Sequence, residues 1–315
     1  MQSATPAPVL VIGTRGSPLA LAQANETRTR IAGANGLDPA AIAISVIRTS
    51  GDRIQDRPLS EAGGKGLFTK EIEEALVAGR IDLAVHSSKD MPTLLPEGLE
   101  LSAFLPREDV RDAFLSPVAA SLADLPEGAV LGTSSLRRRA MALRLRPDLK
   151  TVEFRGNVET RLRKLSEGVA HATLLAMAGL NRLGLSGHAT AVIATDDFLP
   201  PAGQGAVAIE TRMHDERVLR LVRDIDHAPT STALHAERAF LARLDGSCRT
   251  PIGGLATIED GTMTFRGMVL SHDGRRFEQV RLEGPVAEAT AIGVAAAEAL
   301  LARGVADYFR DGPAG

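Results

Sequence analysis

The first two thirds of the chain alternate short apolar runs of β-forming residues with segments of helical spacing, and this alternation limits the possible folds more than any other feature. Alternation of this kind predicts parallel sheets flanked by helices. The expected strands are at 9–12, 42–47, 81–85, 130–131, 152–154 and 172–176, and the expected helices at 18–32, 68–78, 137–145 and 158–165. A break after Leu105 divides them into two series, which predict two α/β domains.

The last third has a different pattern, which predicts a smaller α+β domain. An expected helix at 232–244 precedes β-like runs at 252–258, 263–270 and 277–282, and a long Ala-rich helix follows at 286–302. Asp273-Gly274, between the last two runs, is a dipeptide typical of a hairpin turn. Pro200-Pro201 and Gly203 interrupt the chain before 206–210, where we expect it to cross back to the first domain.

Composition places the chain among ordinary globular proteins. Its 315 residues are 44% hydrophobic and carry a net charge of −3, which argues against a protein built mainly to neutralise nucleic-acid phosphates. With no Trp and one Tyr, few rings are available to stack on bases. Cys248 is the only cysteine, so we expect no intrachain disulfide and no thiolate cluster for a metal.

Neither an export signal nor a membrane span is expected. Residues 1–8 lack a basic segment followed by a long apolar one, so they do not read as a secretory signal. No stretch approaches the roughly 18 uninterrupted apolar residues that cross a bilayer. We therefore expect a soluble protein of the cytoplasm, where a single cysteine stays reduced.

Positive charge is concentrated in one region of this negative chain. The 31 Arg and 5 Lys are most simply explained by a GC-rich genome. Between Val130 and Leu165, however, ten basic and three acidic residues give a local charge of +7. Planar guanidinium groups bind carboxylates through two parallel hydrogen bonds. The region is therefore either a binding site for a ligand with many carboxylates or a solvated basic face.

Two similar turns join a strand to a helix: Gly13-Thr14-Arg15-Gly16-Ser17 and Gly132-Thr133-Ser134-Ser135. Such turns present backbone N–H groups and hydroxyls at the positive end of a helix, which suits an anion. Ser and Thr also cap ordinary helices at these positions, so both interpretations stay open for either turn alone. The arginines that follow the second turn favour an anion.

The polar run His86-Ser87-Ser88-Lys89-Asp90-Met91-Pro92 follows the apolar strand expected at 81–85. Ligands of α/β sheets bind at the carboxyl ends of strands. A carboxylate beside a lysine stays ionised at neutral pH, so Asp90 is a candidate to stabilise a cation or exchange protons. The alternative is a turn with a local Lys89–Asp90 ion pair. We interpret His86 as structural.

Two glycine-containing loops are further candidates. Gly63-Gly64-Lys65-Gly66 lacks the full phosphate-loop motif, and we interpret it as a flexible lid. Cys248 lies in the loop Gly246-Ser247-Cys248-Arg249-Thr250-Pro251. A free cysteine is most often a small buried hydrophobic residue, whereas a Gly/Ser/Pro loop beside an arginine favours an exposed thiolate.

Eight sequence blocks together resemble one known family over nearly the whole chain. They are T-R-G-S-P-L-A-L-A-Q (14–23), G-G-K-G-L-F-T-K-E (63–71), D-L-A-V-H-S-S-K-D-M-P (82–92), R-E-D-V-R-D-A-F (107–114), G-T-S-S-L-R-R (132–138), F-R-G-N-V-E-T-R (154–161), P-A-G-Q-G-A-V (201–207) and G-S-C-R-T-P-I-G (246–253). The chain resembles the hydroxymethylbilane synthases, also called porphobilinogen deaminases. Residues after about Ile258 match only loosely.

The resemblance implies a fold and its division. It implies two α/β domains of the periplasmic-binding-protein type (type II), joined by two crossovers, and a small C-terminal α+β domain. We place the first domain at 1–105 and 206–224, the second at 106–205 and the third at 225–315. The active site is expected between the first two domains, and the third carries Cys248 on a loop.

The resemblance also implies a transferase of tetrapyrrole and heme biosynthesis. Such an enzyme condenses four porphobilinogen molecules head to tail, releases ammonia at each step and hydrolyses the product to hydroxymethylbilane. The family carries a dipyrromethane cofactor, made from the substrate and attached by a thioether to the cysteine that matches Cys248. The family suggests a monomer.

The family's motifs assign expected roles to residues of this chain. Asp90 matches the catalytic carboxylate, which is expected to stabilise cationic intermediates and assist proton transfer. The residues expected to bind carboxylates of cofactor and substrate are Arg15, Ser17, Lys89, Thr133, Ser135, Arg137, Arg138, Arg155, Arg161 and Arg182. Lys65 and Phe68 belong to the expected lid.

Two other classes of function are alternatives. A two-lobed, non-enzymatic binding protein for a polycarboxylate ligand explains the paired turns and the arginines, but not the Cys248 loop or the third domain. A nucleic-acid-binding protein would use residues 130–165, but the negative overall charge and the few aromatic rings argue against it. We expect no nucleic-acid or membrane partner.

Overall fold

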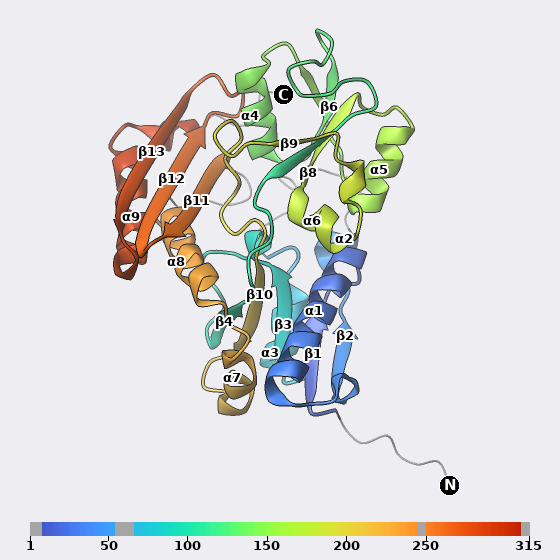
Figure 1. Cartoon of the computed structure of the whole chain (residues 1–315), viewed down its shortest axis with the longest axis vertical. Coiled ribbons are helices and arrows are strands. Elements are labelled where there is room, and N and C mark those ends of the chain that lie inside the picture. The colour runs from blue at the N-terminus through green and yellow to red at the C-terminus, as the bar shows by residue number, and fades with distance from the viewer. Residues whose placement is uncertain (1–7, 54–65, 245–249, 310–315) are drawn as a thin grey trace.

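The computed structural model describes residues 8–53, 66–244 and 250–309, which build three sheets (Figure 1). Two sheets have five strands each and form the first and second α/β units, at the bottom and top of Figure 1. The third has three strands and forms the C-terminal unit at the left. This architecture confirms the predicted fold class. The strands fall within the ranges predicted for three domains, whose boundaries stay a prediction.

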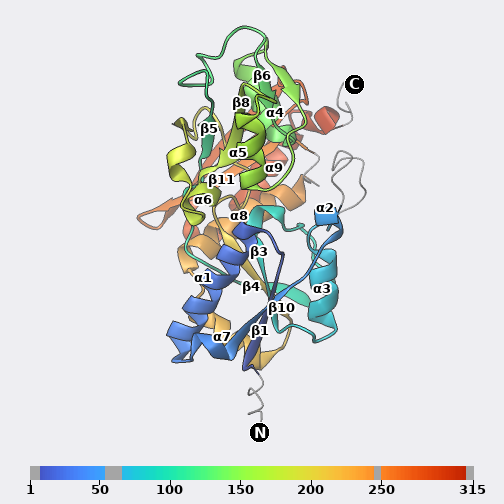
Figure 2. The ribbon, with the colours of Figure 1, turned by 90° about the vertical axis from the view of Figure 1, so that its right-hand side faces the viewer.

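The first α/β unit has the strand order β2-β1-β3-β10-β4. Its strands are β1 (Leu10–Thr14), β2 (Ile42–Val46), β3 (Leu83–Ser87), β4 (Leu99–Phe104) and β10 (Val207–Arg212). Its helices are α1 (Pro18–Asn35), α2 (Ser50–Arg53), α3 (Lys70–Val77) and α7 (Glu216–Arg223). Because side chains alternate along a strand, Leu10 and Ile12 pack with α1 on one face, while Val11 packs with α3 on the other (Figure 2).

The second α/β unit repeats this order as β7-β6-β8-β5-β9. Its strands are β5 (Asp112–Leu115), β6 (Val130–Gly132), β7 (Lys150–Val152), β8 (Ala172–Ala176) and β9 (Ala191–Ile193). Its helices are α4 (Leu136–Leu145), α5 (Val158–Ser166) and α6 (Met177–Arg182). In each sheet the first three strands of the expected series are parallel, whereas the fourth strand in the order runs antiparallel to its neighbours.

The prediction of parallel sheets was therefore wrong for part of each sheet. Strands β4, β5 and β9 were not predicted, and the strand expected at 152–154 lies two residues earlier, at Lys150–Val152. Phe154 leaves the sheet and is fully buried against Leu165 and Leu175. The antiparallel strands arise because the chain enters the second sheet through β5 and returns to the first through β10.

Two connectors join the α/β units, residues 105–111 and 194–206, and they hydrogen-bond to each other. The amide of Glu108 donates to the carbonyl of Gly205 at 3.1 Å, and the amide of Leu105 donates to the carbonyl of Val207, the first residue of β10, at 3.1 Å. Gly205 has a φ of 88°, and a Cβ there would lie 2.4 Å from the Glu108 carbonyl oxygen, so only glycine fits. The return of the chain through β10 confirms the crossover predicted at 206–210.

The C-terminal unit is an antiparallel meander covered by two helices. Its strands are β11 (Ile252–Glu259), β12 (Thr262–Leu270) and β13 (Phe277–Pro285), and its helices are α8 (Ala228–Arg243) and α9 (Ala289–Leu301). Phe240 of α8 and Phe265 of β12 meet in its core, with ring centroids 4.9 Å apart. The predicted turn at Asp273-Gly274 joins β12 to β13, with Gly274 at a φ of 72°. No helix in the described part of the chain is both long and apolar enough to span a bilayer.

Candidate active site between the two α/β units

The predicted site residues of the first α/β unit gather at one edge of its sheet. Strands β1 and β3 are parallel neighbours, so the turn after β1 and the loop after β3 lie side by side. Residues of both segments line a cavity with about 440 Å³ of empty space, including its open mouth: Arg15, Ser17, Leu19, Ala20, Gln23, Phe68, Thr69, Val85, His86, Ser87 and Asp90. Four of the predicted site residues, Arg15, Ser17, Phe68 and Asp90, therefore line one cavity, while their roles stay a prediction.

A second cavity adjoins the first and reaches the second α/β unit. The two cavities share Leu19, Gln23 and Ser87. The second is also lined by Lys89, by Ala176, Ala178, Gly179 and Arg182 of the second unit, and by Gly203, Gly205 and Ala206 of the connector. The candidate site is therefore a cleft with walls from both α/β units.

The two predicted anion-binding turns both cap helices. Ser17 accepts a hydrogen bond from the amide of Ala20 at 3.3 Å, and Ser135 accepts one from the amide of Arg138 at 3.4 Å. Thr133 is buried, and its hydroxyl accepts from the amide of Ser135 at 3.2 Å. Capping uses an oxygen lone pair and leaves the O–H of Ser17 and Ser135 available to donate to an anion. The two interpretations of these turns are therefore compatible.

Asp90 ends a short 3-10 turn, Ser88–Asp90, directly after β3. Its side chain is exposed, and within the described ranges it makes no hydrogen bond or ion pair. The alternative of a local ion pair with Lys89 is not observed there, because the Lys89 Nζ donates instead to Gln204 Oε1 at 3.0 Å. His86, four residues earlier, is buried with its Nε2 3.1 Å from Glu210 Oε2, as expected of a structural residue.

The Lys89 ammonium lies among like charges. Burial and the charges of Arg138 and Arg137, opposed by those of Asp90 and Asp112, together lower its pKa to about 8. Arg161 behaves similarly: burial and the charge of Arg138 lower its pKa to about 10, against the attraction of Asp90. Its Nε donates to the carbonyl of Gly156 at 3.0 Å. Groups from both α/β units therefore act on one another across the cleft.

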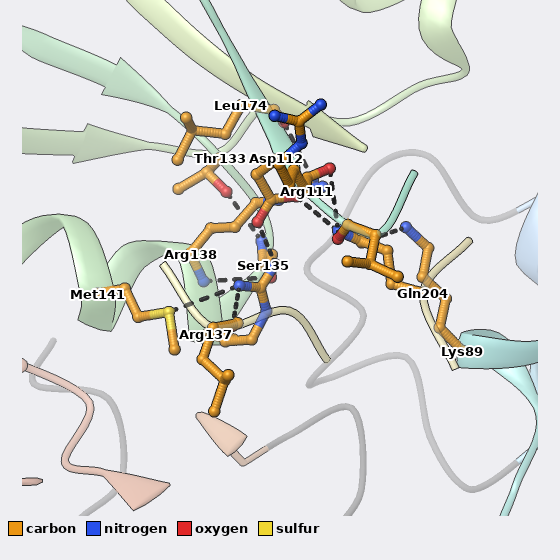
Figure 3. Close-up of polar contacts among 12 residues, drawn as sticks. Lys89, Arg111, Asp112, Thr133, Ser135, Arg137, Arg138, Met141, Leu174 and Gln204 are labelled. Atoms are coloured by element: carbon orange, nitrogen blue, oxygen red, sulfur yellow. Dashed lines mark hydrogen bonds and ion pairs between the residues drawn. The ribbon is translucent and has the colours of Figure 1, made fainter. Parts of the chain in front are cut away.

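Arg137 and Arg138 are bound to a carboxylate of the protein itself. Both are buried on α4, with Arg137 Nη2 2.6 Å from Asp112 Oδ2 and Arg138 Nη2 2.7 Å from Asp112 Oδ1 (Figure 3). Burial raises the pKa of Asp112, but the two guanidinium groups outweigh it and hold the pKa well below its ordinary value. Arg137 Nε is buried without a hydrogen-bond partner in the described part of the chain. The predicted ligand contacts of this pair stay a prediction.

Arg182 also has a partner within the protein. It lies at the end of α6 in the second unit, where its Nε is 3.2 Å from Glu26 Oε2 on α1 of the first. Its Nη2 donates to the carbonyl of Gly205 at 3.1 Å. Arg182 therefore ties the two walls of the cleft together, and it lines the second cavity. Arg155 is half-buried before α5, in the charge field of Arg161.

Of the residues predicted for the lid and the cysteine loop, Phe68 lies in the described part of the chain. Cys248 and Lys65 lie outside the described residues. Phe68 lines the first cavity, and the Arg15 guanidinium carbon lies 4.3 Å from its ring centroid. Phe68 thus contacts a predicted anion-binding arginine. Within 8–53, 66–244 and 250–309, no three His, Cys, Asp or Glu residues are grouped to hold a metal ion.

Sequence reasoning missed three polar residues at this site: Gln23, Asp112 and Gln204. Gln23 Nε2 donates to Ser87 Oγ at 2.9 Å, and Gln204 Nε2 donates to Asp112 Oδ1 at 3.0 Å. One signal was available for Asp112, which is a charged residue at the start of the apolar strand Asp-Ala-Phe-Leu. No such signal marks Gln204, whose burial depends on the packing of the two connectors.

Comparisons with known proteins identify one family over most of the chain. The family described as "Porphobilinogen deaminase, dipyromethane cofactor binding domain" matches residues 10–220, and "Porphobilinogen deaminase, C-terminal domain" matches residues 231–302. The chain is 60% identical to a porphobilinogen deaminase of Nitrobacter winogradskyi over 310 residues, which cover 98% of each chain. It is 55% identical to one of Paracoccus denitrificans over 298 residues, 95% of each chain.

Two solved structures follow part of the course of this chain. A putative methionine-binding lipoprotein of Bacillus subtilis has a TM-score of 0.42 and 15% identity, over 69% of this chain and 89% of that one. A periplasmic substrate-binding protein of an ABC transporter from Coxiella burnetii has a TM-score of 0.43 and 16% identity, over 70% and 93%.

Proposed function

Because the chain belongs to the porphobilinogen deaminase family, we propose that its cleft carries out the hydroxymethylbilane synthase reaction. In this reaction porphobilinogen molecules are joined head to tail with loss of ammonia, and the linear tetrapyrrole is released by hydrolysis. The observation that carries the proposal is the exposed carboxylate of Asp90 within a field of cationic side chains, of which Arg15, Lys89 and Arg182 line the same cleft.

The cationic groups suit a substrate with carboxylates. Each porphobilinogen carries an acetate and a propionate, so a chain of joined units is a polyanion. Burial and the positive charge of Arg138 lower the pKa values of both Lys89 and Arg161. A carboxylate brought into the cleft would therefore offset the repulsion among these cations. We propose that Arg15, Ser17, Lys89, Arg155 and Arg161 contact substrate carboxylates. Arg182 would do so by giving up its ion pair with Glu26 and binding a substrate carboxylate in its place.

Asp90 has the chemistry that the reaction requires. Loss of ammonia leaves the substrate as a cation, and a fixed carboxylate in the cleft lowers the energy of that cation. The same carboxylate is able to accept a proton when the carbon–carbon bond forms. Asp90 is exposed and makes no hydrogen bond within the described residues, so both oxygens are free to face the reacting atoms. Asp112, another carboxylate in the charge field, is occupied by two arginines.

The residues present fit the family's dipyrromethane cofactor. The buried Arg137 Nε, which lacks a partner in the described part of the chain, and the hydroxyls of Thr133 and Ser135 are donors for its carboxylates. When bound, the cofactor supplies the pyrrole carbon to which the first substrate is joined. We propose that the cofactor is attached to Cys248 through a thioether. We propose further that Arg137 and Arg138 contact the carboxylates of the cofactor. Lys65 and Phe68 are proposed as parts of a lid.

The reaction itself is the direct test. Purified protein is given porphobilinogen, and ammonia and linear tetrapyrrole are measured together. We expect about one ammonia for each porphobilinogen consumed, because each condensation breaks one carbon–nitrogen bond. Binding of porphobilinogen without release of ammonia would instead support the two-lobed binding protein. We further propose a cytoplasmic monomer, supported by the single cysteine and by the family.

Because of the lowered pKa of Lys89, we expect the capture of substrate to weaken at alkaline pH. Its pKa is lowered to about 8, so its positive charge is present below that pH and is lost as the pH rises through it. If Lys89 holds a substrate carboxylate, kcat/KM will fall over the same interval, because this ratio reports the ionisation of the free enzyme. Lys89→Arg should move the fall to higher pH, since a guanidinium stays charged. The same alkaline limit in both enzymes would remove Lys89 from substrate binding.

A further inference from the structure

A buried carboxylate and a buried amide, which the mechanism above does not use, connect the two sides of the cleft (Figure 3). Asp112 begins β5 in the second α/β unit, and Gln204 lies on the connector that returns to the first; both side chains are fully buried. We propose that Asp112 and Gln204 are positioning residues, which hold Lys89 and the adjoining Asp90 loop in register with the pair Arg137 and Arg138. The inference rests on the proposed function, because it concerns the reaction of that cleft.

Asp112 holds three side chains at once. Its Oδ2 accepts from Arg137 Nη2 at 2.6 Å, and its Oδ1 accepts from Arg138 Nη2 at 2.7 Å and from Gln204 Nε2 at 3.0 Å. The two guanidinium groups are held further by backbone carbonyls, Arg137 by Leu199 at 2.8 Å and Arg138 by Leu174 at 3.0 Å. Their orientation is therefore set before any ligand binds, which lowers the entropy lost on binding.

Gln204 extends this set of contacts to Lys89 in the first unit. Its Oε1 accepts from Lys89 Nζ at 3.0 Å, while its Nε2 donates to Asp112 and to the carbonyl of Val110 at 2.8 Å. We call the hydrogen-bonded chain Asp112–Gln204–Lys89 the path. A primary amide has an acceptor end and a donor end, so one end suits a cation and the other a carboxylate. Glutamate at 204 would repel Asp112, and a basic residue would repel Lys89. The backbone of Gln204 is also held, since Arg107 Nε donates to its carbonyl at 2.9 Å.

Structural need alone does not explain this arrangement. Asp112 is already neutralised by two arginines, so its burial does not require Gln204. Lys89 borders an open cavity, where water is available to it, yet it is tied to Gln204 among like charges that lower its pKa. The path ends one residue before Asp90, where an error of about an ångström can cost on the order of 100-fold in rate. Positioning of the Asp90 loop accounts for the contact.

The first test compares Gln204→Met with Asn35→Leu in the cofactor-loaded enzyme. Methionine keeps the length of the side chain but removes both ends of the amide. Asn35 is the matched control, because its amide also joins two segments, donating to the carbonyls of Ile31 and Leu221 at 2.9 Å, but lies on α1 near α7. We expect Gln204→Met to lower kcat by roughly 10- to 100-fold with a smaller change in KM, while Asn35→Leu keeps kcat. Equal kcat values in the two variants would contradict the inference.

A double variant separates positioning from stability. If Gln204 acts through Lys89, adding Gln204→Met to Lys89→Met will cause little further loss of kcat, because the path is already broken. A merely structural role for Gln204 would instead multiply the two losses, as independent effects do. That result would overturn the inference even if each single variant were slow. This comparison requires no substitution of Asp112, so it stands even where a change of that buried carboxylate unfolds the protein.

The second readout does not depend on activity. The rate at which an amine reagent modifies Lys89, followed by mass spectrometry across neutral and alkaline pH, reports the ionisation of its Nζ. The charged groups that act on Lys89 are Asp90 and Asp112, which raise its pKa, and Arg137 and Arg138, which lower it. Asp112→Asn removes one raising charge, and Gln204→Met removes an acceptor of the ammonium. Both should therefore shift Lys89 modification to lower pH than in Asn35→Leu.

Unchanged modification in both variants would contradict the path from Asp112 to Lys89, whatever the activity. If the path is intact but the purified protein releases no ammonia from porphobilinogen, the proposed function fails while the contact stands. The two failures are thus distinguishable.

Discussion

Asp90→Asn should nearly stop turnover while leaving the fold and the first binding of substrate intact. The amide keeps the shape of the side chain but removes the charge that faces the cationic substrate, and it is a far poorer proton acceptor. Asp90 is exposed and makes no hydrogen bond within the described ranges, so its loss should not lower the melting temperature appreciably. The measurement is single-turnover reaction of porphobilinogen with the loaded enzyme, with thermal melts beside it.

Asp90→Glu and Asp124→Asn complete this test. Glutamate keeps the charge but displaces it by one methylene, and a displacement of about an ångström can cost on the order of 100-fold, so slow activity should persist. Asp124 is another exposed carboxylate, bonded to Ser121 on a loop of the second unit, and its amide variant should turn over normally. Near-normal turnover in Asp90→Asn would remove Asp90 from the mechanism, and unfolding of that variant would make its role structural.

Cys248→Ser should abolish both the covalent dipyrrole and nearly all activity. Cys248 is the only cysteine of the chain, so no other thiol is available to form the thioether. A serine hydroxyl is almost the same size but is a much weaker nucleophile than a thiolate. Intact mass reports the adduct, and release of ammonia reports the reaction. A variant that carries no adduct yet is fully active would show that Cys248 does not anchor a primer.

Much of the α/β architecture follows from local patterns in the sequence. The helices α1, α4, α5 and α9 begin within a few residues of their predicted starts, and Ser17, Ser135 and Asn157 cap the first three. The antiparallel pairing of strands β5 and β10 cannot be predicted from the residues next to them in the sequence. Which neighbours they take depends on where the two connectors pass between the sheets, and β5 is a four-residue strand that opens with a buried charge.

The site was predictable to a similar extent. Motifs at the ends of β1 and β3 led to Arg15, Ser17 and Asp90, which do line one cavity. The partners of the arginines could not be predicted, because Asp112 is 25 residues from Arg137 and 92 from Gln204 in the sequence. Spacing along α4 shows that Arg137 and Arg138 are adjacent, but not that one carboxylate from another strand binds both.

The intact mass of the purified protein, before and after a brief exposure to porphobilinogen, tests the central claim most directly. The account predicts a mass above that of the sequence by one covalent dipyrrole, followed by stepwise additions of single pyrrole units as substrate is supplied. It predicts further that both the first adduct and the later additions are lost in Cys248→Ser. A purified protein that has the bare sequence mass, gains no pyrrole units and still produces tetrapyrrole would contradict the account.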